Sequence, residues 1–420
     1  MPSPIDNSLS ARPCPAAPTP PSFAKAVQHG SLWLSLALLS ACGGSPSPAP
    51  APKPPEPEPV ITGPGEFKAA AALPAVSIEA INTALRAAGA KAPAITPRYA
   101  VTPYRIEYLT IDGSGQTVRA SGLVCVPAKP SGALSPLLAY QHGTTAHDAE
   151  VPSNHAVADE AAVVMASAGY IVLAPDYVGY GVSKGQPHPY LLSAPSAAAV
   201  NDLLTASATW RKSVGIADNQ QLFLAGYSEG GYTTVAAARA LSTATTKPLS
   251  THRAQLQSVV VGAGPYQTSV TMDELLRLVK ADNPLLAAVL NPGFLKLLGS
   301  DVRAKVRNEL LKKALGSDAD VVFQSTFLDN YLADDNEAIE RLSNVHNWKP
   351  EKPLRFYHGR DDRTVPYPSS TVTLQAMQAQ GAGALLSLTD CGAQPAGHLE
   401  CVKPYWDFMM GEFARDARDL

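Results

Sequence analysis

The sequence predicts an α/β fold in which a mostly parallel central sheet carries helices on both faces and an inserted helical cap. Three observations predict it. Short apolar segments recur along the chain, and stretches with helical periodicity alternate with them. These segments are apolar along their whole length, as is typical of strands in a parallel sheet that helices cover on both faces. The 420 residues include 45% hydrophobic and 16% charged side chains, a composition that supports a large core.

An export signal is predicted at the start of the chain. The apolar run over residues 32–41 is too short to span a bilayer but has the length of the apolar region of a signal peptide. It ends in Leu-Ser-Ala before Cys42, which resembles the lipobox of bacterial lipoproteins, in which the chain is cut before the cysteine and the cysteine carries the lipid. We therefore expect a lipoprotein signal peptide over residues 1–41. The alternative is an ordinary secretory signal in which Cys42 stands by chance.

A proline-rich linker is predicted after the signal. Residues 42–65 are mostly Pro, Ala, Ser, Gly and Glu, and this composition favours an extended polyproline II conformation. Such a segment would hold a folded domain away from a membrane surface. We therefore expect an exported protein of the bacterial cell envelope, anchored by lipid at the outer membrane or the cell surface.

The folded part is predicted to begin with a helix and a hairpin. Residues 77–88 have the periodicity of an amphipathic helix with Ser77 as its N-cap. Residues 104–111 and 118–126 are predicted strands, joined by a turn that contains two glycines. Further short apolar strands are predicted over residues 137–141, 170–174, 222–225, 258–262, 354–357 and 385–388.

A helical insertion is predicted before the strand at residues 354–357. Helical stretches are expected over residues 272–280, 285–298, 302–315, 321–332 and 337–342. A crossover between parallel strands needs only about a dozen residues, so the remainder is an insertion. We therefore assign residues 66–266 and 350–420 to the core and residues 267–349 to a cap. The apolar residues of 285–298 form a small core of the cap, line an acyl pocket, or do both.

A GxSxG motif marks a candidate nucleophile. The predicted strand at residues 222–225 is followed by Gly226-Tyr227-Ser228-Glu229-Gly230 and then by a helical stretch. This context is typical of a nucleophile elbow, a sharp turn that exposes the serine hydroxyl. The positions two before and two after the serine crowd together there, and Gly226 and Gly230 meet the need for small residues. Ser228 is therefore the predicted nucleophile.

A candidate acid and a candidate base follow later in the chain. The segment after the strand at residues 354–357 has the form GxxDxxVP, which favours Asp362 over its neighbour Asp361. His398 lies in the loop between the last predicted strand and the terminal helix. His398 would take the proton of Ser228, while Asp362 would fix the tautomer of the imidazole.

Two backbone amides are candidate donors to the oxyanion that such an attack creates. The amide of Glu229 is the first, because it directly follows the nucleophile. The second should come from the loop after the strand at residues 137–141, where Gly143 permits a close approach and the amide of Thr144 is the predicted donor. His142 in the same loop is a possible base, but it precedes the nucleophile, so we interpret it as a residue that braces the loop.

Four motifs of the chain occur together in one family. They are Gln141-His142-Gly143-Thr144, Ala174-Pro175-Asp176-Tyr177-Val178-Gly179-Tyr180-Gly181, His188-Pro189-Tyr190 and Gly226-Tyr227-Ser228-Glu229-Gly230-Gly231. From about residue 104 to the C-terminus, the chain resembles the secretory-lipase family of α/β-hydrolases, which includes the fungal lipase A type and bacterial relatives. The resemblance implies the α/β-hydrolase fold, esterase or lipase activity, a helical cap and no cofactor. The order serine, aspartate, histidine is also the order of that fold.

The sequence thus predicts a serine carboxylic-ester hydrolase that forms an acyl-enzyme on short to medium acyl esters, with a small-molecule or lipid ester as substrate. A serine peptidase or amidase on the same fold is one alternative. A catalytically silent lipoprotein that binds a ligand at the surface is another. The net charge of −3, with no basic stripe, argues against nucleic-acid binding. No cysteine pair has zinc spacing, so no metal site is expected.

Three cysteines fall in the predicted folded part. Cys391 and Cys401 stand ten residues apart on either side of His398. Disulfides persist in exported proteins, so we expect these two cysteines to form a bridge that fixes the loop of the base. The alternative is two free thiols that lie close in sequence by chance. Cys125, inside a predicted strand, is expected to be a buried free thiol.

Overall fold

The structure, a computed structural model, covers the predicted core. It describes residues 60–282, 299–301, 303–305, 307–308 and 318–420. The predicted signal peptide, Cys42 and most of the proline-rich linker lie outside the described residues, as do the predicted helix 285–298 and most of the predicted helix 302–315. In the part of the chain that is described, no helix combines the length and the apolar character that crossing a membrane requires.

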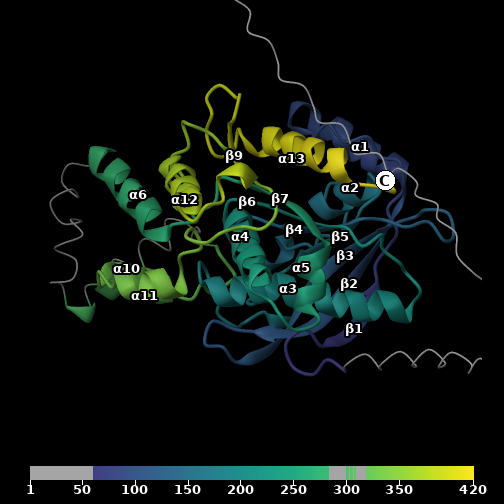
Figure 1. The fold of residues 1–420 in the computed structure, drawn as a ribbon, viewed down its shortest axis with the longest axis horizontal. Coiled ribbons are helices and arrows are strands. Elements are labelled where there is room, and N and C mark those ends of the chain that lie inside the picture. Colours follow the sequence, from purple (N-terminus) through teal and green to yellow (C-terminus); the bar gives the residue numbers. More distant parts are fainter. Residues whose placement is uncertain (1–59, 283–298, 302, 306, 309–317) are drawn as a thin grey trace, which may run out of the picture. The chain divides into compact units, whose positions relative to one another are not determined.

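A nine-stranded sheet forms the centre of the fold (Figure 1). Its strands are β1 (Phe67–Ala72), β2 (Val101–Ile111), β3 (Thr117–Pro127), β4 (Leu137–Gln141), β5 (Ile171–Pro175), β6 (Leu222–Tyr227), β7 (Leu256–Gly262), β8 (Leu354–His358) and β9 (Leu386–Asp390). They stand in the order β1-β2-β3-β5-β4-β6-β7-β8-β9. The pairs β1–β2, β2–β3 and β3–β5 are antiparallel, and the pairs from β5–β4 onward are parallel. The predicted, mostly parallel α/β fold is confirmed.

Helices cover both faces of this sheet. The α-helices are α1 (Ile78–Ala88), α2 (Ala161–Ser167), α3 (Ser193–Ser213), α4 (Glu229–Ser242), α5 (Leu249–Gln255), α6 (Thr268–Asp282), α10 (Thr326–Leu332), α11 (Asn336–Leu342), α12 (Pro368–Ala379) and α13 (Val402–Asp416). Short 3-10 helices are η1 (Gly89–Lys91), η2 (Asp148–Glu150), η3 (Gly181–Ser183) and η4 (Gly383–Leu385). Helices α1, α2 and α13 pack on one face, and α3, α4 and α12 pack on the other.

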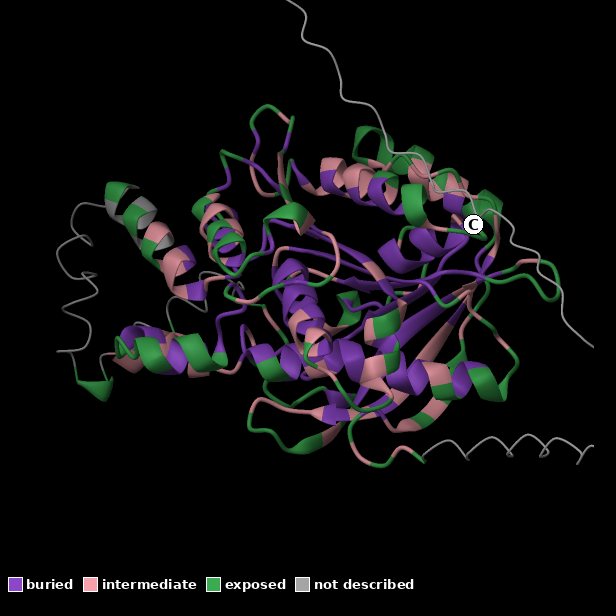
Figure 2. Ribbon diagram, viewed as in Figure 1, coloured by how far each residue is buried: buried purple, intermediate pink, exposed green. Residues whose placement is uncertain are grey.

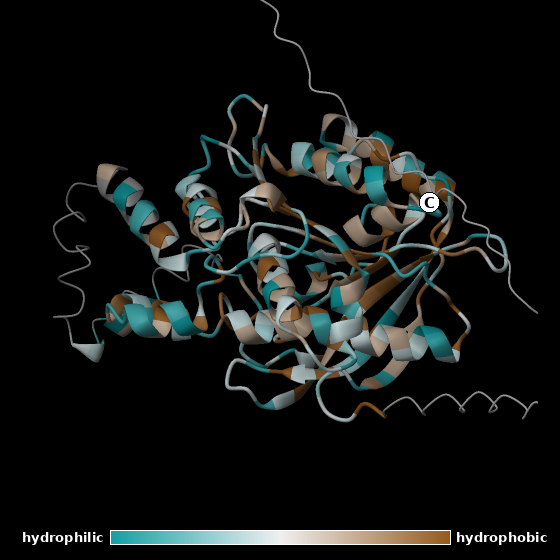
Figure 3. Cartoon of the chain, in the orientation of Figure 1, coloured by the Kyte–Doolittle hydropathy of each residue, from teal (hydrophilic) through white to brown (hydrophobic). Residues whose placement is uncertain are grey.

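The central strands contribute to two hydrophobic cores, one on each face. In β6, Leu222 and Leu224 belong to the core that α3 and α4 share, whereas Phe223 and Ala225 belong to the core that α2 and α13 share. This division follows from the alternation of side chains along a strand. Figure 2 shows buried residues along the strands and on the sides of the helices that face them, and Figure 3 shows how much of the sheet is apolar. Burial on both faces explains why these strands are apolar throughout.

The N-terminal elements include one that the sequence predicted and one that it did not. Helix α1 begins as predicted, because the Ser77 hydroxyl accepts a hydrogen bond from the Ala80 amide at 3.1 Å. Strand β1 was not predicted, since its sequence Phe-Lys-Ala-Ala-Ala-Ala lacks the β-branched residues that favour strands. It lies at the edge of the sheet and pairs antiparallel with β2. Strand pairing of this kind rests on hydrogen bonds between backbone groups, which no pattern of side chains predicts.

The described part of the insertion between β7 and β8 is mainly helical and packs on the core. Helix α6 lies against α11 and α12, and α10 lies against α11, at the left of Figure 1. Phe327, Leu332 and Ile339 join the same hydrophobic core as α3 and α4. The helix predicted over residues 321–332 is wrong for residues 321–325: the chain there runs beside His188 and α10 begins only at Thr326. Backbone bonds to a distant loop override the local helical pattern at that point.

Candidate active site

Ser228 occupies a tight turn between β6 and α4. Its backbone has φ +60° and ψ −125°, a conformation that residues other than glycine rarely adopt. A Cβ atom at Gly226 would lie 2.2 Å from the carbonyl oxygen of Gly230, and a Cβ atom at Gly230 would lie 2.0 Å from that of Gln141. Both positions of the predicted elbow therefore require glycine. The strained turn lifts the hydroxyl of Ser228 to the end of the sheet, where it is half-buried.

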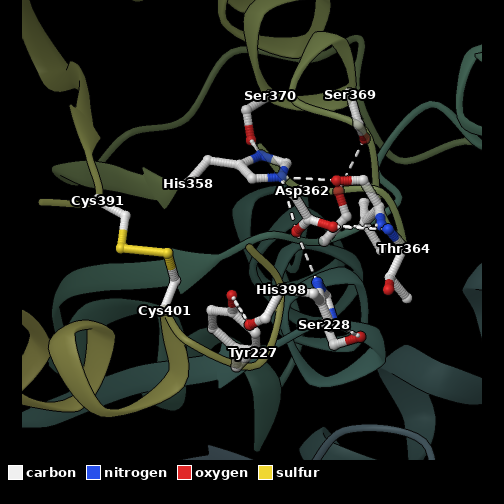
Figure 4. Close-up of polar contacts among 12 residues, drawn as sticks. Tyr227, Ser228, His358, Asp362, Thr364, Ser369, Ser370, Cys391, His398 and Cys401 are labelled. Atoms are coloured by element: carbon white, nitrogen blue, oxygen red, sulfur yellow. Dashed lines mark hydrogen bonds and ion pairs between the residues drawn. A yellow bond between two sulfur atoms is a disulfide. The ribbon is translucent and has the colours of Figure 1, made fainter. Parts of the chain in front are cut away.

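His398 connects Ser228 to Asp362 (Figure 4). Its Nε2 lies 3.0 Å from Oγ of Ser228, and its Nδ1 lies 2.6 Å from Oδ2 of Asp362. A carboxylate only accepts, so Nδ1 carries the proton and Nε2 presents a lone pair to the serine hydroxyl. Ser228, Asp362 and His398 stand after the carboxyl ends of β6, β8 and β9, respectively. These ends lie on the same edge of the sheet. The structure thus brings the three predicted catalytic residues together.

Asp362 is buried and held by several donors. Its Oδ1 accepts hydrogen bonds from the backbone amides of Thr364 and Val365, each at 2.8 Å. Burial raises the pKa of Asp362, but hydrogen bonds with His358 and His398 outweigh that effect and lower the pKa to about 2. The carboxyl group is therefore an anion at neutral pH. Its neighbour Asp361 accepts instead from the amide of Ala396 at 2.9 Å, so of the two aspartates it is Asp362 that faces the imidazole.

His358 is a further residue of this site, and it was not among the predicted site residues. Its Nε2 lies 2.8 Å from the Val365 carbonyl oxygen and 3.3 Å from Oδ2 of Asp362, while its Nδ1 lies 2.7 Å from the Ser370 hydroxyl (Figure 4). Because a carbonyl and a carboxylate only accept, Nε2 carries the proton. His358 therefore fixes the loop and the carboxylate of Asp362. Its place as the first residue of the HGxxDxxVP segment was the available sequence signal.

Cys391 and Cys401 are joined by a disulfide, with their Cα atoms 6.0 Å apart (Figure 4). The bridge closes the loop that carries His398, and closure of so short a loop stabilises a fold by about 2 to 3 kcal/mol. The Tyr227 hydroxyl also donates to the carbonyl oxygen of His398 at 2.8 Å. The loop of the base is thus held from two sides. Cys125 is free and buried in β3, and burial raises the pKa of its thiol.

The two predicted oxyanion donors come from segments that meet at Ser228. Glu229 is the first residue of α4, where backbone amides point out of the helix end. A Cβ atom at Gly143 would lie 3.6 Å from Cβ of Ser228, so the loop that carries Thr144 passes close to the serine. For the amides of Glu229 and Thr144, no acceptor is found among the residues that the structure describes. Their role as oxyanion donors stays a prediction.

His142 packs inside the loop that carries Thr144. Its Nδ1 lies 2.7 Å from the carbonyl oxygen of Gly143, and its ring stacks on Tyr177 at a centroid distance of 4.3 Å. The Tyr177 hydroxyl donates to the His142 carbonyl at 2.9 Å. Burial lowers the pKa of the imidazole, which favours its neutral form. These contacts agree with the interpretation that His142 braces the loop.

The side chain of Glu229 has a partner that sequence reasoning did not identify. Its Oε1 lies 2.6 Å from Nε2 of His188, and both side chains are buried. Burial raises the pKa of Glu229, but the imidazole of His188 and the Thr144 side chain act against it, so the pKa lies below its usual value. The two residues belong to separate motifs, His-Pro-Tyr and GxSxG, and no local pattern links them. Within the described residues, no group of His, Cys, Asp and Glu could hold a metal ion.

Comparison with known proteins identifies a family and a fold for this chain. The secretory lipase family model matches residues 154–399. No match was found among curated proteins. LipA from Xanthomonas oryzae, a rice cell wall degrading esterase, superimposes with a TM-score of 0.65 at 22% identity, over 85% of this chain and 100% of that one. A Legionella pneumophila protein gives a TM-score of 0.65 at 22% identity, over 83% and 98% of the two chains.

A third solved structure is less similar to this chain. Candida antarctica lipase A in its closed state gives a TM-score of 0.51 at 16% identity, over 83% of each chain. At such identities the solved structures establish the α/β-hydrolase fold, and the family model carries the assignment of the family. A match to secretory lipases also agrees with the predicted export. Because that model matches more than half of the 420 residues, the chain belongs to the secretory lipase family and is a carboxylic-ester hydrolase.

Proposed function

We propose that the protein cleaves esters through an acyl-enzyme formed on Ser228. The observation that carries this proposal is the continuous chain of hydrogen bonds from Asp362 through His398 to the serine hydroxyl. Nε2 of His398 would take the proton as Oγ attacks the acyl carbon, and the oxyanion would lie toward the amides of Glu229 and Thr144. The leaving alcohol then takes that proton. Water, deprotonated by His398, would release the acid in a second attack.

The charge of Asp362 supports this sequence of steps. When His398 accepts the proton it becomes a cation, and the buried carboxylate 2.6 Å away stabilises that cation. The amides of Thr364 and Val365 and the imidazole of His358 already satisfy the other acceptor positions of the carboxylate. Since these partners are in place before the reaction, little reorganisation is needed in the transition state.

Labelling with a fluorophosphonate probe tests the mechanism. The probe phosphonylates an activated serine, so we expect a single labelled residue, Ser228, after peptide mapping. A folded protein that does not label would favour the alternative of a catalytically silent binding lipoprotein. Matched nitrophenyl ester and nitroanilide substrates with the same acyl group address the other alternative, because a peptidase or amidase would cleave the anilide at a rate comparable to that of the ester.

We further propose that residues 267–349 form a cap that limits the acyl group to short or medium length. Each methylene that enters an apolar pocket contributes about 0.8 kcal/mol, so the rate should rise with chain length until the pocket is filled and then fall. We expect kcat/KM on nitrophenyl esters from two to sixteen carbons to peak in the short to medium range. A steady rise to sixteen carbons would contradict the proposal and indicate a long acyl tunnel.

We also propose that Cys42 anchors the protein in the bacterial cell envelope, at the outer membrane or the cell surface. Several acyl chains on one residue anchor strongly where a single chain binds only reversibly. The Cys42→Ser variant should therefore appear in the soluble fraction with its esterase activity retained, because the described fold begins well after this residue. The measurement is activity in membrane and soluble fractions. A variant that still sediments with membranes would remove the lipobox interpretation.

A further inference from the structure

A buried ionic contact lies directly beside the nucleophile and has no place in the steps described so far. Glu229 follows Ser228 in sequence, and its carboxylate is 2.6 Å from Nε2 of His188. The two side chains are 3% and 4% exposed, so the contact is shielded from water. Burying a charged group is unfavourable unless it is paired. Such a pair next to a nucleophile therefore calls for a functional explanation.

The acceptor groups around this contact determine where its protons lie. Nδ1 of His188 lies 2.9 Å from the carbonyl oxygen of Val178, which can only accept, so Nδ1 carries a proton. The carboxylate of Glu229 can interact with Nε2 at 2.6 Å only if a second proton lies between them. His188 and Glu229 together thus share one proton in a charge-assisted hydrogen bond, which is stronger and more directional than a neutral one.

Residues 322–324 of the insertion between β7 and β8 pack against this contact. The His188 amide donates to the Val322 carbonyl at 2.7 Å, and the Gln324 amide donates to the His188 carbonyl at 2.8 Å, so the backbone of His188 is fixed on both sides. The ring of Phe323 meets the imidazole edge-on at 5.0 Å, and Tyr180 does so at 5.1 Å. The imidazole is therefore held both by the loop before α3 and by the insertion.

The backbone of the elbow needs such a constraint. Ser228 has a positive φ, and a strained turn is maintained only where its surroundings fix it. Glu229 is the next residue, and its side chain and its amide belong to the same first turn of α4. A side chain fixed at its far end restricts the backbone to which it is attached. Because catalytic geometry tolerates little error, a displacement of about 1 Å can lower a rate about a hundredfold.

We propose that His188 is a positioning residue: it holds the Glu229 side chain and thereby aims the Glu229 amide at the oxyanion. The insertion segment at residues 322–324 keeps the contact in place and dry. This inference rests on the proposed acyl-enzyme mechanism. It assigns a function to the His-Pro-Tyr motif, whose histidine lies 41 residues before Glu229 in the chain.

Three variants test the proposal through kcat and KM. His188→Ala and Glu229→Ala remove the contact, and each should lower kcat about a hundredfold, within the range seen when an oxyanion donor is lost, while KM changes less than about threefold. Glu229→Gln is the conservative variant: its amide can donate to Nε2 of a neutral His188, whose Nδ1–H still reaches Val178. We expect Glu229→Gln to retain kcat within about fivefold of the parent, since the contact survives in a weaker, neutral form.

A matched control separates positioning from general loss of stability. Arg211 and Asp218 form another ion pair at 2.6 Å, with Arg211 buried and Asp218 partly buried, and Asp218 precedes the end of β6 that lies away from Ser228. Asp218→Ala should lower the thermal midpoint as His188→Ala does, but leave kcat per active site within about twofold of the parent. Active sites are counted by fluorophosphonate labelling to completion, so an unfolded fraction does not enter kcat.

The outcomes are distinguishable. If the parent protein does not label at Ser228, the proposed mechanism fails, and this inference fails with it. If the parent labels and the two alanine variants keep kcat within threefold, the mechanism stands and His188 has no positioning role. The proposal would also be overturned if kcat of Glu229→Gln fell as far as kcat of Glu229→Ala. The contact would then provide something other than the position of the Glu229 side chain.

Discussion

The Ser228→Ala variant is expected to lose ester hydrolysis by about five to six orders of magnitude in kcat. Serine and histidine of a triad act as a unit, so removal of the nucleophile leaves only the weak catalysis that bound water and the oxyanion donors provide. The imidazole of His398 would still face the site but would have no hydroxyl within 3.0 Å to deprotonate. The measurement is kcat on a nitrophenyl ester that the parent hydrolyses well.

The fold of this variant should be unchanged. Alanine keeps the Cβ atom that the strained backbone already accommodates, and the elbow amide of residue 228 still donates to the Gly262 carbonyl, 2.9 Å away in the parent. The thermal midpoint should therefore stay within a few degrees. Ser213 is an exposed serine at the end of α3 whose hydroxyl donates to the Trp210 carbonyl, so Ser213→Ala is a suitable control and should keep full activity. Residual activity of Ser228→Ala within tenfold of the parent would defeat the assignment of the nucleophile.

The Asp362→Asn variant is expected to lose about four orders of magnitude in kcat. The asparagine amide can donate to Nδ1 of His398, which would place the imidazole proton on Nε2, and a protonated Nε2 cannot accept the serine proton. The variant also loses the anion that stabilises the imidazolium. Fluorophosphonate labelling should slow by a similar factor, because it depends on the same deprotonation of Ser228.

The adjacent residue supplies the control for this variant. Asp361 accepts from the Ala396 amide, and an asparagine at position 361 can still accept with its side-chain oxygen. Asp361→Asn should therefore keep kcat within about threefold of the parent. If Asp361→Asn loses more activity than Asp362→Asn, the carboxylate that orients His398 has been misassigned. Both variants replace one oxygen of a carboxylate by nitrogen at neighbouring positions, so the comparison isolates the hydrogen bond to the base.

The sequence by itself determined the α/β fold, the core strands from β2 onward, the elbow motif at Ser228 and the loop position of His398, and it favoured Asp362 over Asp361. These features depend on local patterns: side-chain alternation buries both faces of β6, and a strand-turn-helix with Gly226 and Gly230 can close only one kind of turn. The pairing of Cys391 with Cys401 was also accessible, because the two cysteines flank one short loop. The elbow and the cysteine pair each lie within about ten residues, whereas the order of serine, aspartate and histidine that indicated Asp362 and His398 spans 170 residues.

The tertiary structure alone decided the contacts between distant segments. It showed that Asp362 rather than Asp361 faces His398, that His358 supports the same carboxylate, and that His188 pairs with Glu229. It also overrode local preference in two places, the alanine-rich strand β1 and the non-helical residues 321–325. In these cases the stabilising partners are backbone groups or side chains far away in the chain. Hydrogen bonds to such partners form only after the sheet has brought them together, so no local pattern of residues can encode them.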